Sequence, residues 1–124
     1  MNTDGEQEYI FDFEKLDVYQ RALQFAAEII TIVKRLEPHL KFTIGSNLIR
    51  AAMSVANNIA EGSGKRSAGD KARYYGYSLA STRECVPSIA ILFMEKQISI
   101  KERDSLRGEC VALGSMVGGL IRKA

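Results

Sequence analysis

The sequence predicts an all-α protein, an antiparallel four-helix bundle of up-down-up-down course. Apolar residues recur at steps of three and four over four separate stretches. Proline, glycine and capping residues stand between these stretches. No run alternates polar and apolar residues for long enough to make a strand, and the connections are short, which is typical of a bundle. We expect one domain over residues 13–124, after an acidic, flexible segment at residues 1–12.

The first two helices are expected over residues 15–36 and 42–61. Pro38 predicts the end of the first helix, because its ring disfavours helical geometry at the residue before it. Gly62 and Gly64 follow the second helix, where left-handed C-capping geometry favours glycine. The two apolar stripes are Leu16, Tyr19, Leu23, Ala26, Ile30 and Val33, and then Ile44, Leu48, Ala52, Val55 and Ile59.

The third and fourth helices are expected over residues 68–97 and 100–122. Two capping pairs open them. The first, Ser67 with Asp70, is a shorter variant of the capping box, and the second, Ser99 with Glu102, is a proper one. Pro87 predicts a kink rather than a break, since the apolar pattern continues in phase on both sides. The stripes are Tyr75, Leu79, Thr82, Val86, Ile89 and Phe93, and then Leu106, Cys110, Leu113, Val117 and Leu120.

The composition of the 124 residues, 46% hydrophobic and 26% charged, is that of one folded domain. Two cysteines are too few for a disulfide framework, which favours a reducing, cytoplasmic location. The polar, acidic start is unlike a signal peptide, and the longest weakly polar stretch, residues 110–121, is too short to span a bilayer. We therefore expect no membrane partner. Residues 1–17 carry six acids and one lysine, which leaves a basic remainder that could attract a polyanion.

The sequence offers no convincing catalytic or metal-binding constellation. Its one histidine, His39, stands in a turn after Pro38, and the Glu-x-x-His pairs of a diiron bundle are absent. Cysteine or serine catalysis would need His39 to reach Cys85 or a serine, with a third residue to orient it. A solvated turn histidine is the better interpretation. We expect no enzymatic activity and no cofactor, and we expect Cys110, on the apolar stripe, to be a buried, inert thiol.

The segment EGSGKRS, residues 61–67, joins the second and third helices and admits two interpretations. A phosphate-binding P-loop needs Gly-x-x-x-x-Gly-Lys-Ser/Thr between a strand and a helix, and both the spacing and the strand are missing. The segment is therefore expected to end one helix and begin the next. The free N–H groups near Ser67, helped by Lys65 and Arg66, could still hold an anion.

The segment KARYYGY, residues 71–77, interleaves Lys71 and Arg73 with three tyrosines. One interpretation is a platform on which basic groups meet phosphate, tyrosines stack on bases, and Arg73 lies over Tyr77, four residues on. The other places Tyr75 in the core, because it heads the inward stripe, and the remaining tyrosines at a subunit contact.

Two further pairs are expected to be structural. Arg50 and Glu84 fall opposite one another in a hairpin that turns near residue 66. Both stand among small or apolar neighbours, where an unpaired charge is costly, so we expect an ion pair between helices. Gly114 and Gly118 leave a bare patch on the fourth helix, which favours close packing between subunits; fraying toward the C-terminus is the alternative.

Three segments of the chain resemble one protein family. They are FEKLDVYQRA (13–22), IRAAMSVANNIAEGSGKRS (49–67) and YYGYSLASTRE (74–84), and the core of the signature is Asn-Ile-Ala-Glu-Gly, residues 58–62. On these motifs the chain is similar to the four-helix-bundle family of large-subunit (23S) ribosomal RNA intervening-sequence proteins. The likeness spans nearly the whole chain from Phe13, with Tyr19 where tryptophan is usual and Ala80 where glycine is frequent.

The resemblance implies an antiparallel four-helix bundle that assembles into a ring, typically a homopentamer. It also implies a fold similar to that of the accessory variability protein of diversity-generating retroelements. That relative is a basic pentameric barrel that binds nucleic acid and a reverse transcriptase. The family has no established catalytic activity and no agreed set of binding residues.

The leading hypothesis is therefore a non-enzymatic, ring-forming protein that binds the backbone of structured RNA or DNA without reading bases. On charge alone the binding candidates are Lys65, Arg66, Lys71 and Arg73. The alternative is an oligomeric scaffold that recruits a partner enzyme, such as a reverse transcriptase, with charge serving only solubility.

Overall fold

The computed structural model describes residues 8–124, and within that range the chain is all helical, with no strand. Four long helices make up the domain: α1 (Asp17–Lys34), α3 (Ser46–Ser63), α4 (Ala68–Met94) and α5 (Ile100–Lys123). The prediction of an all-α domain with four main helices is confirmed. The first seven residues of the predicted flexible segment lie outside the described residues.

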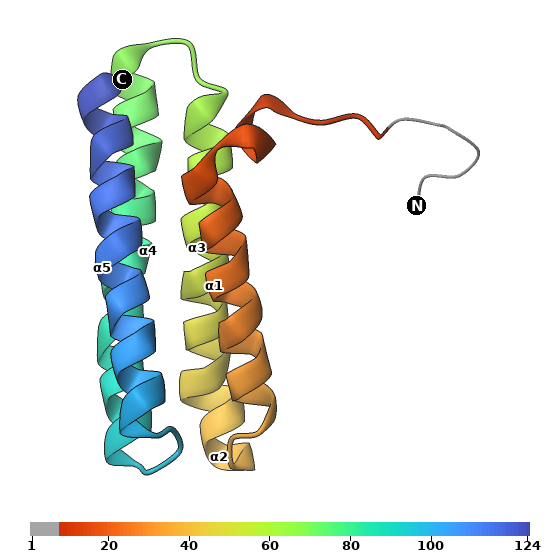
Figure 1. Ribbon diagram of the computed structural model, residues 1–124, viewed down its shortest axis with the longest axis vertical. Coiled ribbons are helices and arrows are strands. Elements are labelled where there is room, and N and C mark those ends of the chain that lie inside the picture. The colour runs from red at the N-terminus through yellow and green to blue at the C-terminus, as the bar shows by residue number, and fades with distance from the viewer. Residues whose placement is uncertain (1–7) are drawn as a thin grey trace.

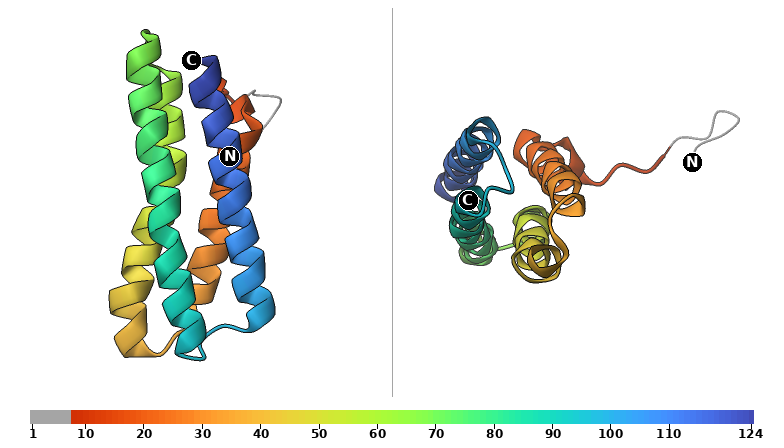
Figure 2. Two further views of the ribbon diagram at one scale, coloured as in Figure 1. Left: turned by 90° about the vertical axis from the view of Figure 1, so that its left-hand side faces the viewer. Right: turned by 90° about the horizontal axis from the view of Figure 1, so that it is seen from below.

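The four helices lie side by side along the long axis of the molecule (Figure 1). The chain descends along α1, returns along α3, descends along α4 and returns along α5. Contacts join α1 to α3, α3 to α4, α4 to α5, and α5 back to α1, so the bundle is closed (Figure 2). We call the end that carries the α3–α4 connection the upper end, as it appears in Figure 1.

Three short elements complete the fold, and they correct two predicted boundaries. A 3-10 turn, η1 (Asp12–Lys15), precedes α1, and α2 (Pro38–Leu40) and the π-turn η2 (Lys41–Gly45) lead into α3. The helix expected to reach residue 36 ends at Lys34, and Pro38 begins the next helix instead of ending the last one. Proline fits the first helical position because the N–H it lacks has no partner there.

The core is a single apolar cluster that all four long helices supply. The stripes predicted for α3 and α5 are mostly buried, but the stripe predicted for α1 is partly wrong: Leu23 is 46% exposed. The buried side chains of α1 are Val18, Ala22, Phe25, Ala26, Ile29, Ile32 and Val33. The helix carries two overlapping apolar stripes, and packing against its neighbours, rather than spacing, selects between them.

The end of α3 also differs from the prediction, because Gly62 lies inside the helix and is buried. A Cβ atom at Gly62 would lie 2.7 Å from Cε1 of Tyr75 and 3.2 Å from Cβ of Tyr74, so this glycine permits close approach of α4. Gly64 caps the helix with φ −86°, which is not the left-handed geometry expected there. Gly62 therefore serves packing, and neither glycine provides the expected left-handed turn.

The two expected capping pairs differ in completeness. Ser67 accepts the N–H of Asp70 at 3.1 Å, but the carboxylate of Asp70 lies beside Arg73 instead of returning the bond. Ser99 and Glu102 exchange both bonds, at 3.0 and 2.9 Å, in a full capping box. Helix α4 continues through Pro87 without a break.

Candidate nucleic-acid interface

The α3–α4 connection brings the four basic candidates to one upper corner, where three of them have partners of their own. Lys65 lies 3.1 Å from Glu61, and the hydrogen bond to that carboxylate raises the pKa of Lys65 above its usual range. Lys71 donates to the carbonyl oxygen of Ser63 at 2.9 Å, which closes the last turn of α3. These two lysines therefore stabilise the corner and also give it positive charge.

A tyrosine stands between two of these cations. The ammonium of Lys65 lies 4.7 Å, and the guanidinium of Arg73 5.1 Å, from the centre of the Tyr74 ring. The expected contact of Arg73 with Tyr77 is not formed; Tyr77 instead meets Tyr74 edge-on at 5.4 Å. Arg73 thus lies over the ring of the next residue, Tyr74, rather than over that of Tyr77. Tyr75 is in the core, 5% exposed.

Arg66 is the cation of this corner that is left free. It is exposed and makes neither a hydrogen bond nor an ion pair with another residue of the described range 8–124. A guanidinium of this kind carries its full charge to solvent and presents donors that match phosphate oxygens.

The start of α4 is a weaker anion site than its free N–H groups suggest. Ser67 already accepts one first-turn N–H group, and Asp70 places a carboxylate in that same turn. A carboxylate there satisfies the positive end of the helix dipole and repels a second anion. Any anion at this corner is therefore held mainly by side-chain cations.

Two basic residues that sequence reasoning left out, Arg122 and Lys123, lie at the same upper end. They close the last turn of α5, and the C-terminus stands beside the start of α4 in both Figure 1 and Figure 2. The up-down-up-down course was the signal that could have placed them there. The start of α1 shares this end but is acidic, with Asp12, Glu14 and Asp17. The basic surface thus runs over the α3–α4 connection, the start of α4 and the end of α5.

The Arg50–Glu84 pair forms at 3.7 Å between α3 and α4, but at the surface, with the side chains 69% and 47% exposed. Arg50 also donates to the side chain of Asn47. The expected ion pair is present, but its side chains are exposed in spite of their small and apolar neighbours in the sequence. A pair so exposed contributes about 0–1 kcal/mol.

The motif residues that carry the family resemblance serve the α3–α4 contact. Ser81 donates to Ser54 at 2.8 Å, Asn58 donates to the same hydroxyl at 2.9 Å, and Ser78 donates to the carbonyl of Val55 at 2.9 Å. Together with Gly62, these small polar residues allow two backbones to approach closely while each hydroxyl stays satisfied.

Gly114 and Gly118 of α5 lie in different surroundings. Gly114 borders a shallow apolar groove between α4 and α5 of about 200 Å³. A Cβ atom at Gly118 would meet the guanidinium of Arg122 at 3.4 Å, so the side chain of Arg122 covers that position. The patch is therefore not uniformly bare.

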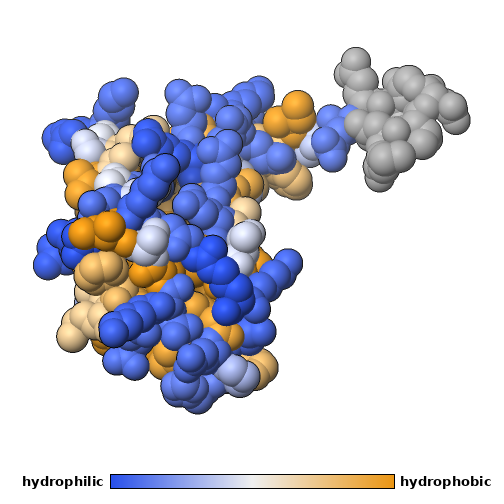
Figure 3. Space-filling view, turned by 60° about the horizontal axis from the view of Figure 1, so that its bottom comes forward, coloured by the Kyte–Doolittle hydropathy of each residue, from blue (hydrophilic) through white to orange (hydrophobic). Residues whose placement is uncertain are grey.

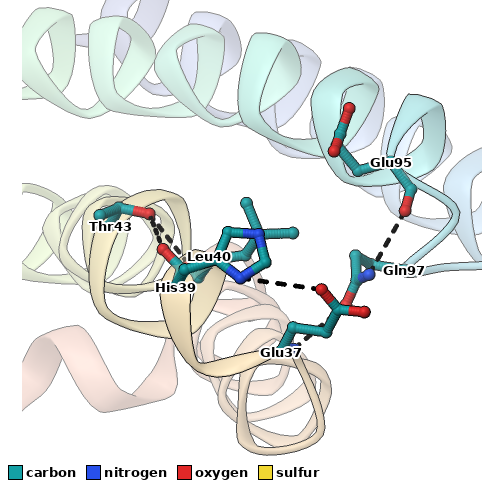
Figure 4. A network of polar contacts seen from close by, with 6 residues as sticks. All are labelled: Glu37, His39, Leu40, Thr43, Glu95 and Gln97. Carbon is teal, nitrogen blue, oxygen red and sulfur yellow. Dashed lines mark hydrogen bonds and ion pairs between the residues drawn. The ribbon is translucent and has the colours of Figure 1, made fainter.

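The histidine and the two cysteines lie apart from this corner. His39 is exposed at the lower end, 3.7 Å from Glu37, in a polar contact network with Gln97 (Figure 4). The Cys85 and Cys110 thiols are buried, and burial raises their pKa values to about 12 and about 11.

Within residues 8–124 no group of three or more histidine, cysteine or acidic side chains could hold a metal ion. In the same range no helix is both long and apolar enough to cross a membrane.

The fold and its α3–α4 signature define a class of small helical-bundle proteins, and comparison gives the family. The model of the 23S rRNA-intervening sequence protein family matches residues 14–119, so the chain belongs to that family. A crystal structure of a protein of unknown function from the S23 ribosomal protein family of Bacteroides thetaiotaomicron is similar, with a TM-score of 0.78 and 21% identity. The similarity covers 85% of this chain and 95% of the other. No curated protein matches the chain.

Proposed function

We propose that the protein is a non-enzymatic, ring-forming nucleic-acid-associated protein whose antiparallel bundle binds the backbone of structured RNA or DNA. The contacts come from Lys65, Arg66, Lys71 and Arg73, without base-specific readout. The observation that carries the proposal is the guanidinium of Arg66, free within residues 8–124, in a corner where the acids of that range are Glu61 and Asp70.

Three features support this proposal. Lys65 and Arg73 lie against Tyr74 and Lys71 is bonded to the end of α3, so these three side chains lose little entropy when a phosphate binds. Arg122 and Lys123 extend the positive surface along the same end. The family name, which refers to a ribosomal RNA gene segment, fits a protein that works near RNA.

Charge reversal tests the site. The double variant Arg66→Glu with Arg73→Glu should lose filter binding of a structured RNA hairpin, because four units of charge change at the corner. The control, Lys34→Glu with Lys101→Glu, makes the same change in net charge at the lower end and should bind as the unaltered protein does. Equal loss in both variants, or no binding by the unaltered protein at low salt, would contradict the proposal.

A second candidate function, a scaffold that recruits a partner enzyme such as a reverse transcriptase, is favoured by apolar side chains at the lower end. Phe42 and Met94 are each 74% exposed, and Ile91 is 42% exposed. Figure 3, which turns this end forward, shows hydrophobic side chains (orange) reaching the surface between hydrophilic ones. A nuclease-resistant protein partner that is lost on Phe42→Ser and Met94→Ser would favour this function.

A further inference from the structure

A row of aromatic side chains leaves the bundle ahead of η1. Residues 8–11, which we call the aromatic arm, extend away from the side formed by α1 and α3 (Figure 1). Tyr9, Ile10 and Phe11 are 76%, 55% and 54% exposed. Ring centres lie 4.9 Å apart for Tyr9 and Phe11, and 5.6 Å apart for Phe11 and Phe13. Three consecutive large apolar side chains in solvent are unfavourable unless another surface covers them.

The base of the arm is fixed, and its charge is negative. The N–H of Phe11 donates to the carboxylate of Glu14 at 2.9 Å, and Phe13 packs edge-on against Tyr19 of α1 at 4.9 Å. Glu8 and Asp12, at the two ends of the apolar row, are exposed and pair with no cation of the described range 8–124. The arm is thus an apolar row between two carboxylates, which excludes a polyanion as its partner.

The groove between α4 and α5 has the opposite pattern. Its floor is apolar, with Leu79, Val86, Cys110 and Val111, and Arg83 and Arg107 lie along it. Val111 is 72% exposed, and neither arginine has an acidic partner within residues 8–124. At about 200 Å³ the groove is smaller than the ~300–1,000 Å³ of small-molecule sites, and a side chain fits it better.

We propose that the aromatic arm of one chain docks in the α4–α5 groove of a second copy. The apolar row covers the floor of the groove, and Glu8 and Asp12 lie beside Arg107 and Arg83. Apolar surface meets apolar surface, and each unpaired charge meets its opposite. The inference deepens the self-assembly in the proposed function and rests on it.

The arm cannot reach the groove of its own chain. Four residues span at most about 14 Å. Leu79, the groove residue nearest the start of α4, lies eleven residues beyond Ala68, about 16 Å down the helix. The arm also leaves on the side away from α4 and α5, as Figure 1 and the right-hand view of Figure 2 agree. A contact between the arm and this groove therefore joins two chains, and the matching charges favour a second copy.

This arrangement is head-to-tail. Each chain gives its arm on the α1–α3 side and receives an arm on the α4–α5 side, so two different surfaces meet at every contact. A head-to-tail contact generates a ring when the rotation between neighbours closes. The contact therefore has the geometry that a closed ring requires.

Sedimentation velocity over a range of concentrations tests the proposal. Arg83→Glu with Arg107→Glu, and separately Glu8→Lys with Asp12→Lys, should each weaken self-association by about tenfold or more, because like charges then meet. The four changes together should restore it. Rescue distinguishes a lost contact from a lost fold, and far-UV circular dichroism checks that each variant is helical.

Removing the apolar row gives a second readout. Tyr9→Ser with Phe11→Ser should weaken association by about tenfold or more, whereas Phe42→Ser, an equally exposed aromatic elsewhere, should not. Undiminished assembly of the Tyr9→Ser with Phe11→Ser variant, or charge reversals that fail to rescue one another, would overturn the arm proposal alone. A strict monomer of 13.8 kDa would overturn ring formation and the arm proposal together, while leaving nucleic-acid binding to its own assay.

Discussion

At the scale of single residues, the α3–α4 hairpin depends on small side chains that let the two helices approach closely, rather than on ion pairs between them. Gly62 leaves room for the buried ring of Tyr75, and the hydroxyls of Ser54, Ser78 and Ser81 satisfy one another or a backbone carbonyl. A tightly packed interior has no space for an added methyl group without displacing a neighbour. Packing between the two helices therefore explains Gly62 and these serines of the family motif.

Substitution of Gly62 by alanine tests that explanation. The new Cβ would lie within 2.8 Å of two atoms of the Tyr75 ring, and such overpacking costs about 1–3 kcal/mol of the free energy of unfolding. Gly76→Ala is the matched control: nothing lies within 4 Å of its Cβ position, so the change should stabilise α4 by up to about 1 kcal/mol. Urea denaturation measures both. Equal stability of the two variants would contradict the account.

The two thiols provide a second residue-scale prediction. Burial raises the pKa of Cys110 to about 11 and that of Cys85 to about 12. Since thiolate is the reactive form, only about one Cys110 side chain in a thousand is reactive thiolate at pH 8. Iodoacetamide should label neither cysteine in the native protein and both in denaturant, as read by intact mass. Rapid native labelling would mean that the α4–α5 contact opens.

At the scale of elements, ion pairs hold the seam between α1 and α5. Arg21 lies 2.5 Å from Glu109, and Arg35 pairs with Glu102 one turn from the start of α5. Glu102 also accepts the N–H of Ser99 in the capping box, so one carboxylate serves both the helix start and the seam. The hydrogen bond from Arg35, followed by that from Ser99, lowers the pKa of Glu102 below its usual 4.5.

That lowered pKa predicts the pH dependence of stability. A carboxylate whose pKa is lower in the folded than in the unfolded state stabilises the fold above the unfolded value of 4.5. The contribution is lost as the pH falls through the folded value. Glu102→Gln should lower the free energy of unfolding by about 1 kcal/mol at pH 7. In this variant the free energy of unfolding should also fall less steeply as the pH is lowered. Glu28 is an exposed carboxylate of α1, and the Glu28→Gln variant should lose stability at low pH as the unaltered protein does. Identical acid profiles for the two variants would contradict the assignment.

Much of the element structure was predictable from the sequence, and the rest depended on tertiary contacts. Capping residues gave the starts of α4 and α5, because Ser67 and Ser99 act locally on the backbone. The end of α1 and the role of Pro38 were mispredicted, since a proline ends one helix or begins another according to what packs around it. The buried face of α1 was ambiguous for the same reason: Leu23 and Phe25 are both apolar, and only the neighbouring helices select Phe25.

At the scale of the whole molecule, charge and apolar surface are separated by the course of the chain. The upper end is basic at the α3–α4 connection, the start of α4 and the end of α5, whereas the chain around the start of α1 at the same end is acidic. Lys65, Arg66, Lys71 and Arg73 were foreseeable as a local cluster. Two other features were not foreseeable, because they depend on how distant segments of the chain meet. They are the contribution of Arg122 to the basic surface and the direction of the aromatic arm, away from the α4–α5 groove.

Backbone binding to nucleic acid is the central claim, and its salt dependence is the most direct test. With four corner cations in contact with phosphates, the logarithm of the binding constant should fall against the logarithm of salt concentration with a slope of about −3 per chain. The slope should be shallower in Arg66→Ala with Arg73→Ala, and unchanged in Lys34→Ala with Lys101→Ala. Fluorescence anisotropy of a labelled RNA hairpin, titrated from low to moderate salt, measures it. A slope near zero, or one that the corner substitutions leave unchanged, would contradict the account.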